Sequence, residues 1–188
     1  MSLKELSKYT ITSKYAKYLP EEKRRETWQE TVERCRDMHL RKYSFLPQED
    51  LLEIEEAFEA VKRKEVAPSM RSLQFGGEAI ERKNARMYNC CVGHVYDSRS
   101  IQKAFWLLLC GCGVGLGFTR KFTSRFPKLV NYKQAHQTTY VIPDTIEGWA
   151  DSVRVLIDSF TEGNEHSGKS FNFDYSQIRE KGLPLSIG

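Results

Sequence analysis

Apolar residues recur at helical spacing through the first third of the chain. Between residues 27 and 43 they fall on one face, at Trp28, Val32, Cys35 and Met38. A second apolar stripe follows between residues 49 and 66, at Leu51, Ile54, Phe58 and Val61. We expect Pro68 to end this second helix, because the residue before a proline avoids helical geometry. The pattern predicts an N-terminal helical region over residues 1–66.

From Ala67 onward the pattern alternates between strand and helix. Residues 88–95 and 116–120 predict strands, and the apolar run between them predicts a helix capped by Ser98. Asp144 begins a stretch typical of a capping box, with Glu147 at the third helical position. The predicted helix has one apolar face, made of Ile146, Trp149, Val153, Leu156, Ile157 and Phe160. Strict alternation in residues 170–176 then predicts a strand, so residues 67–188 favour an α/β fold.

Composition and charge narrow the class of protein. The 188 residues are 40% hydrophobic and 29% charged, with a net charge of only +4, which does not favour nucleic-acid binding. No apolar run reaches the roughly 18 residues of a membrane helix, and the first residues do not resemble a signal peptide. We therefore expect no membrane partner and a cytoplasmic location. An odd number of cysteines, five, argues against a disulfide framework there.

Residues 163–170, GNEHSGKS, match the P-loop pattern G-x-x-x-x-G-K-S. A P-loop needs a strand before the glycine-rich loop and a helix after it, so that the helix N-terminus faces the phosphates. The predicted order here is the reverse. We interpret the segment as a turn in which Gly163 closes the helix and Gly168 turns the chain, and keep a P-loop phosphotransferase as the alternative function.

Four glycines alternate in CGCGVGLGF, at positions 111, 113, 115 and 117. They do not meet the dinucleotide pattern G-x-G-x-x-G, and they follow a helix rather than a strand. Alternating glycines allow either close packing of a neighbouring backbone or close approach of a ligand. Both interpretations stay open on the residues alone.

The cysteine spacing favours thiol chemistry or packing over metal binding. Adjacent Cys90 and Cys91, and Cys110 with Cys112, do not have the two-to-four-residue spacing of zinc ligand pairs, so we predict no metal site. Cys110 extends an apolar run and is typical of a buried thiol. Cys90 follows polar Asn89 near the glycines, which favours a reactive thiol in a ligand cleft.

Several stretches together resemble the N-terminal part of a ribonucleotide reductase catalytic chain, in particular the adenosylcobalamin-dependent, monomeric ribonucleoside-triphosphate reductases. They occur in the family's order over most of residues 14–188: YAKYLPEEKRRETWQETVERC, APSMRSL, YNCCVGHVYDS, GCGVGLGF, YVIPDTIEGWADSVRVLIDSF and FDYSQIREKGLPLSIG. The ordered set is more specific than any single motif.

The resemblance implies a ten-stranded α/β barrel, of which residues 67–188 would be the first part. It also implies thiyl-radical chemistry, started by adenosylcobalamin, that converts ribonucleotides, expected to be triphosphates, into deoxyribonucleotides. Cys90 matches one of two redox-active cysteines whose disulfide is reduced by thioredoxin or a similar donor. Ser69, Asn89 and Gly113 match positions that line the substrate.

The resemblance further implies a deoxynucleotide effector site. Asp97 matches a residue near the effector, and residues 120–136 take the place of the first specificity loop. Lys121, Arg125 and Lys128 could meet the effector phosphates there, although the segment is shorter than in the monomeric enzymes.

The chain stops inside the family's second specificity loop, at Gly188. We expect the remaining strands, the radical cysteine and most of the cobalamin site on a second chain, the C-terminal half of a split reductase without which this chain is inactive. A non-catalytic nucleotide-binding module descended from a reductase is a further alternative.

Overall fold

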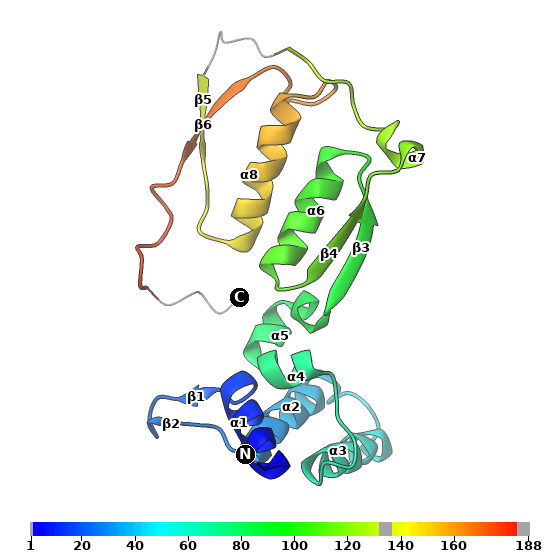
Figure 1. Ribbon diagram of the computed structural model, residues 1–188, viewed down its shortest axis with the longest axis vertical. Coiled ribbons are helices and arrows are strands. Elements are labelled where there is room, and N and C mark those ends of the chain that lie inside the picture. The colour runs from blue at the N-terminus through cyan, green and yellow to red at the C-terminus, as the bar shows by residue number, and fades with distance from the viewer. Residues whose placement is uncertain (1, 132–136, 184–188) are drawn as a thin grey trace. The chain divides into compact units, whose positions relative to one another are not determined.

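The computed structural model describes residues 2–131 and 137–183, and the chain divides between Met87 and Tyr88 into two compact units. Figure 1 shows a mostly helical first unit and a second unit in which strands and helices alternate. The elements of the first unit are α1 (Leu3–Lys14), β1 (Tyr18–Leu19), β2 (Arg24–Arg25), α2 (Trp28–Lys42), α3 (Gln48–Lys62), α4 (Met70–Phe75), α5 (Glu78–Arg82) and the 3₁₀ helix η1 (Asn84–Met87).

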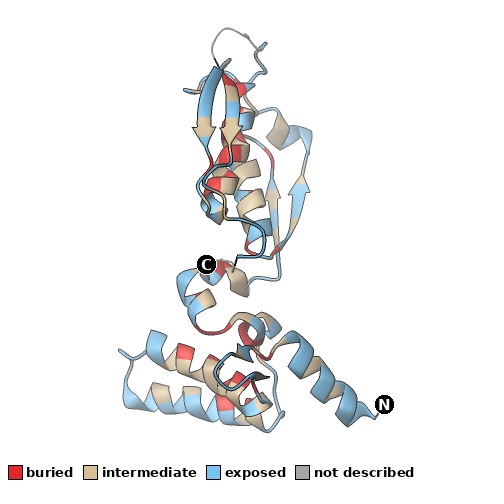
Figure 2. Cartoon of the chain, turned by 90° about the vertical axis from the view of Figure 1, so that its left-hand side faces the viewer, coloured by how far each residue is buried: buried red, intermediate tan, exposed pale blue. Residues whose placement is uncertain are grey.

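The core of the first unit lies where α2 and α3 pack together. Val32 and Cys35 of α2 contact Phe58 and Val61 of α3, and Leu73 of α4 completes the cluster. Burial within α2 and α3 is concentrated on the sides that face this cluster (Figure 2). The apolar stripes that predicted both helices are therefore confirmed as their packing faces.

The helix α3 ends earlier than the sequence predicts. Its last residue is Lys62, and Lys64 then takes the left-handed conformation, with φ +63°. Backbone bonds from Lys64 to Val61 and from Glu65 to Ala60 close the helix, as in a Schellman motif. The prediction that Pro68 ends this helix is wrong, because the left-handed residue stops it first.

A buried ion pair joins the short β2 segment to α2. The Glu26 carboxylate, only 8% exposed, accepts hydrogen bonds from Arg34 at 2.7 and 2.9 Å. Arg34 also donates to the backbone carbonyls of Gly76 and Leu73. Burial alone would raise the pKa of Glu26, but the bonds from Arg34, the Lys17 amide and Thr31 outweigh it and lower the pKa.

The helix α1 packs less closely than its neighbours. Ser2 and Glu5 form a capping box at its start, yet none of its residues is buried. The apolar pattern of the sequence did not single out this helix, because its apolar residues do not form one buried stripe.

The second unit contains two β-α-β segments. The strand β3 (Cys90–His94) pairs in parallel with β4 (Gly113–Gly117) across α6 (Ser98–Leu109), and β5 (Gln137–Val141) pairs in parallel with β6 (Ser170–Asp174) across α8 (Ile146–Ser159). The short helix α7 (Arg120–Thr123) follows β4. The helices α6 and α8 pack side by side (Figure 1).

The two long helices of the second unit, α6 and α8, each have a different cap from the predicted one. Asp97, not Ser98, caps α6, because its Oδ1 accepts the Ser100 amide at 2.6 Å. Thr145, not Asp144, caps α8, and its Oγ1 accepts the Gly148 amide at 2.9 Å. The carboxylate of Asp144 instead accepts a hydrogen bond from Arg179.

Only part of the predicted apolar stripe of α8 is covered: Ile146, Trp149, Val153 and Ile157 are partly buried, and Trp149 packs against Tyr175. The buried residues of α8 are mostly small or polar: Gly148, Ala150, Ser152, Val155, Asp158 and Ser159. Of the predicted stripe, Leu156 is 46% and Phe160 42% exposed. The exposed part of the stripe is therefore limited to its C-terminal end, at Leu156 and Phe160.

The mixture of helices and strands agrees with the predicted α/β class. The described strands form three two-stranded sheets, so the ten-stranded barrel stays a prediction, as does the functional domain limit at residue 66. Three helices after that limit, α4, α5 and η1, cluster with the first unit. In the described parts of the chain, no helix has the length and apolar character needed to cross a membrane.

Candidate functional site

Cys90 and Gly113 stand opposite each other at the N-terminal ends of β3 and β4. The amide of Gly113 donates to the carbonyl of Asn89 at 2.8 Å, which fixes this end of the strand pair. A Cβ atom at Gly113 would lie 3.5 Å from the Cys90 Sγ atom. Three of the predicted site residues, Cys90, Asn89 and Gly113, are therefore brought together, and all three are exposed.

The alternating glycines of β4 form one half of a face of the β3–β4 strand pair, and β3 provides the side chains of the other half. Gly113, Gly115 and Gly117 are the register partners of Cys90, Val92 and His94, whose side chains alternate with Cys91 and Gly93. Cys91 is half-buried and lines a cavity of about 210 Å³ with Ala104 and Leu107 of α6, a cavity that Val92 and His94 also border. At Gly113 and Gly115 bare backbone lies beside Cys90 and Val92, open enough for close approach of another group, whereas the His94 ring covers Gly117.

The five cysteines differ in exposure, and none of them forms a disulfide. Cys90 is exposed, whereas Cys35, Cys110 and Cys112 are buried. The thiol of Cys112 donates to the carbonyl of Tyr88 at 3.3 Å. Burial raises the pKa of Cys35, which disfavours its reactive thiolate form.

A cationic and aromatic cluster lies at the opposite end of the strand pair. His94, the last residue of β3, stacks on Phe122 with ring centroids 3.8 Å apart. Lys121 and Arg125 lie over the same Phe122 ring, at 5.7 and 6.0 Å. Two of the predicted effector-site residues are therefore brought together, about 13 Å along the strand from Cys90 at roughly 3.3 Å per residue.

His94 and Phe122 are the residues that the sequence interpretation missed. A signal for His94 was present, since strand alternation places it on the same face as Cys90. Phe122 lies within the basic stretch TRKFTSRF, where its pairing with His94 depends on the turn after β4.

Asp97 is placed by its capping bond to Ser100, just beyond the His94 end of β3. The capping bond by itself explains why a carboxylate lies at this position. Contact between Asp97 and an effector therefore stays a prediction. Ser69 belongs to the first unit, at the start of α4, where it is exposed and makes no side-chain capping bond. Its part in the site also stays a prediction.

The P-loop spelling has the inverted context that the sequence predicts. Residues 163–170 connect the end of α8 to β6, so no helix begins after them. Gly163 and Gly168 both have positive φ, +81° and +71°. One detail of the prediction is wrong: α8 ends at Ser159 with Phe160 as its C-cap, so Gly163 turns the loop and does not close the helix.

Among the described residues, no three His, Cys, Asp or Glu side chains gather in a way that could hold a metal ion. A corrin brings its own metal and does not need such a cluster of protein ligands. From the sequence we expect most of the corrin-binding residues on the C-terminal half, outside this chain.

Comparison with known proteins gives two sequence relatives and one solved structure. The chain matches no protein-family model. It is 27% identical over 197 residues to a protein of Mycobacterium phage D29 assigned as an adenosylcobalamin-dependent ribonucleoside-triphosphate reductase, covering 86% of this chain and 27% of the relative. A Dictyostelium discoideum protein with the same assignment is 45% identical over 47 residues, 24% of this chain and 6% of the relative.

The fold comparison agrees. A crystal structure of B-12 dependent (class II) ribonucleotide reductase superposes with a TM-score of 0.79 and 22% identity, over 96% of this chain and 33% of the other. The chain thus spans no more than about a third of the length of the proteins it matches. The resemblance seen in the motifs is confirmed: in sequence and in fold, this chain is similar to part of the adenosylcobalamin-dependent ribonucleotide reductases.

Proposed function

We propose that this chain is the N-terminal portion of a ribonucleotide reductase that converts ribonucleotides, preferably triphosphates, into deoxyribonucleotides. The observation that carries the proposal is the exposed Cys90 thiol beside the bare backbone of Gly113, on the open face of β3 and β4. A nucleotide ribose can approach a thiol closely only where no neighbouring side chain shields it. The sequence relatives, both assigned as such reductases, support the same reaction.

In this proposal Cys90 is one of two cysteines that supply the reducing electrons. Two thiols become one disulfide and release two electrons and two protons, while the ribose loses its 2′ oxygen as water and gains hydrogen at that carbon. The atoms balance when a thioredoxin-like dithiol then reduces the disulfide by thiol exchange. Cys90 is suited to this exchange because its thiol is accessible.

Asn89 and Gly113 would border the substrate at the Cys90 end, with Ser69 as a further contact. At the other end, Lys121 and Arg125 would bind the phosphates of a deoxynucleotide effector near Asp97. The stacked rings of His94 and Phe122 support this assignment, because they hold both cations in one place. The strand pair itself then connects the substrate end to the effector end.

Adenosylcobalamin, when bound, supplies the radical that starts such a reaction. We propose that the polypeptide completing the barrel binds most of it and carries both the thiyl-radical cysteine and the second redox cysteine. Two features support a completing polypeptide: the relatives are about three times longer, and apolar side chains such as Val92, 84% exposed, lie on the open strand face. We propose further that it is a second chain, a C-terminal half.

The test uses the chain assembled with that C-terminal half, adenosylcobalamin and a ribonucleoside triphosphate. Wild-type chain should sustain many turnovers with thioredoxin, whereas Cys90→Ser should stop after at most one. Cys91→Ser, which changes the neighbouring thiol on the α6 side, is the matched control and should keep turning over. Sustained turnover by Cys90→Ser would contradict the role of Cys90.

The effector site has its own test in the same assembly. Asp97→Asn keeps a capping oxygen for Ser100 while removing the charge, so it should weaken the effector response without unfolding α6. Lys121→Gln with Arg125→Gln should weaken the effect of a deoxynucleotide on substrate choice, and leave turnover at saturating substrate intact. An unchanged effector response in both variants would place the effector elsewhere.

A further inference from the structure

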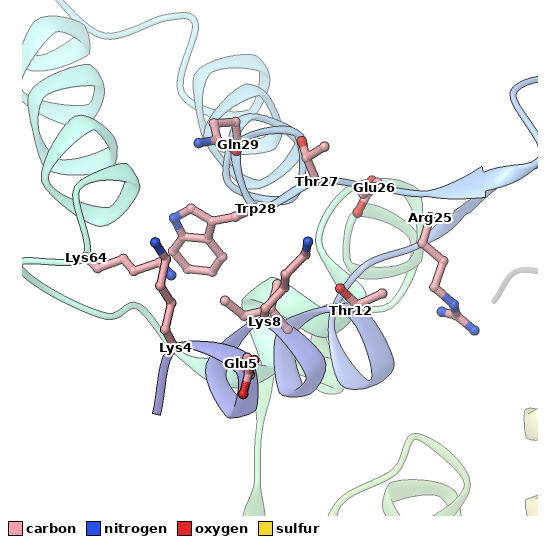
Figure 3. A pocket seen from close by; sticks show the side chains of 11 residues that line it. Lys4, Glu5, Lys8, Thr12, Arg25, Glu26, Thr27, Trp28, Gln29 and Lys64 are labelled. Carbon is pink, nitrogen blue, oxygen red and sulfur yellow. The ribbon is translucent and has the colours of Figure 1, made fainter. Parts of the chain in front are cut away.

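A cavity of the first unit lies between α1, the residues that lead into α2, and Lys64 (Figure 3). Its volume of about 650 Å³ is within the range of roughly 300–1,000 Å³ typical of small-molecule sites. Its lining includes three lysines and an indole: Lys4, Lys8, Lys64 and Trp28.

Three lysines line this cavity. Lys4 and Lys8 are one helical turn apart on α1, a spacing at which like charges repel each other. In Figure 3 both side chains extend from α1 toward the side on which Trp28 and Lys64 lie. Among the described residues, no carboxylate forms an ion pair with Lys4, Lys8 or Lys64. The repulsion between them would be relieved by an anion held in the cavity.

The two carboxylates that line the cavity are engaged elsewhere. Glu5 accepts the Ser2 amide at 2.7 Å as part of the α1 capping box. Glu26 is buried and holds Arg34. The fourth cation at the cavity, Arg25, donates to the carbonyl of Ala16 at 2.8 Å and points away from Trp28 (Figure 3). Of the described residues that line the cavity, three lysines without an ion pair thus face one exposed carboxylate, Glu5.

Trp28 adds a planar surface at a fixed place. Its Nε1 donates to the carbonyl of Lys62 at 3.0 Å, and the ring, partly buried against the core cluster, also lines the cavity. The Lys64 ammonium lies 5.5 Å from the ring centroid. Lys64 occupies the left-handed position after α3, where glycine is the usual residue. A lysine at this position places its charge next to the indole.

We propose that this cavity binds a nucleotide, with its phosphates on Lys4, Lys8 and Lys64 and its base against Trp28. Ammonium groups are common phosphate ligands, and an indole stacks well on any nucleobase. The site is distinct from Cys90, Asp97, Lys121 and Arg125, which belong to the second unit. The inference therefore goes beyond the proposed function and does not depend on it.

Isothermal titration calorimetry of the 188-residue chain with ATP tests the proposal. ATP should bind at least about tenfold more tightly than either adenosine or inorganic tripolyphosphate, because each of these offers only one of the two contacts. The double variant Lys4→Gln/Lys8→Gln should weaken ATP binding at least about tenfold. The control Lys14→Gln/Lys42→Gln makes the same change of charge on α1 and α2 away from the cavity, and should bind as the wild type does.

A third variant separates binding from folding. Lys64→Gly removes the ammonium and suits the left-handed backbone, so it should keep or raise the melting temperature while weakening ATP binding. Tripolyphosphate binding as tightly as ATP would overturn the nucleotide assignment in favour of a simple anion site. So would equal affinities of the Lys4/Lys8 variant and its control, or no ATP binding at millimolar concentration.

The second unit must also be excluded as the source of the signal. A chain carrying Asp97→Asn, Lys121→Gln and Arg125→Gln should retain ATP binding that depends on Lys4 and Lys8. Loss of all binding in this chain would place ATP in the second unit and overturn the inference. None of these outcomes affects the Cys90→Ser test, so the two proposals can fail separately.

Discussion

Cys90 and Gly113 are register partners at the first position of a parallel strand pair, and the missing side chain of Gly113 leaves one flank of the Cys90 thiol open. The neighbouring Cys91 has the opposite orientation and lines the space under α6. Two adjacent cysteines thus have opposite environments because successive residues of a strand face opposite sides. This difference can be measured on the chain alone.

Cys90 should be the first cysteine to react with iodoacetamide under native conditions. The buried thiols of Cys35, Cys110 and Cys112 can react only when the fold opens locally, and burial also raises the pKa of Cys35. Peptide mass spectrometry over a time course measures each site. In Cys90→Ser the fast phase should disappear, and a buried cysteine reacting as fast as Cys90 would contradict the described exposure.

Gly117→Ala should destabilise the chain by about 1 kcal/mol, whereas Gly115→Ala should be neutral or slightly stabilising. A Cβ atom at Gly117 would lie 2.6 Å from the Nδ1 atom of His94, so the ring must leave its stack on Phe122. At Gly115 the nearest atom is 3.7 Å away, in Val92. Chemical denaturation of both variants gives the comparison, and equal stabilities would show that the His94 ring moves freely.

Asp97→Ala should cost about 1 kcal/mol of stability, because it leaves the Ser100 amide at the start of α6 without its acceptor. Asp97→Asn should keep most of that stability, since its side-chain oxygen can accept the same bond. Ser98→Ala is the matched control and should change stability by only a few tenths of a kcal/mol. The melting temperatures of the three variants rank their stabilities. A larger loss for Ser98→Ala than for Asp97→Ala would show that Ser98, not Asp97, caps α6.

Glu26→Gln should destabilise the first unit by about 3 kcal/mol, because it leaves the Arg34 guanidinium buried without its counter-ion. Glu59→Gln removes an exposed partner of Lys62 and should have little effect. Urea unfolding monitored by circular dichroism measures both. A loss below about 1 kcal/mol for Glu26→Gln would show that Arg34 is well satisfied by backbone carbonyls alone.

The Glu26 carboxylate also makes the stability of the folded chain depend on pH. Because the pKa of Glu26 is lower in the folded chain than its ordinary value of 4.5, its contribution to stability is complete above that value. The contribution is lost as the pH falls below 4.5 and through the lowered pKa. Unfolding free energies from about pH 7 to about pH 3 should therefore fall more steeply for the wild type than for Glu26→Gln. If the two proteins lost stability equally with falling pH, the link between the Glu26 charge and stability would be contradicted.

The sequence was most informative where local rules decide the structure. The stripes of α2 and α3 are confirmed because helical spacing and core packing point to the same face. The strand β6 and the inverted context of residues 163–170 were also predictable, since alternation and turn residues specify them locally. The family resemblance required no structural step at all, because the motifs occur in order.

The parts that the sequence did not predict depend on distant neighbours. Apolar periodicity put Leu156 and Phe160 on the buried face of α8, but both are exposed, whereas Ser152 and Ser159 are buried. Asp97 rather than Ser98 caps α6 because the backbone turns one residue earlier than the apolar run indicates. The pairing of His94 with Phe122 depends on the turn after β4, which no local pattern encodes.

The crossover order of the second unit has a consequence for how the chain folds during synthesis. In the first unit the helices α2 and α3 meet across a short loop, so their contacts can form soon after both have been translated. In the second unit each strand can pair only after an entire helix has followed it, and such long-range contacts form slowly. The nascent chain therefore carries a finished helical unit while β3 still waits for β4. We therefore expect the edge of newly made β3, with its exposed thiol, to stay unpaired during that interval.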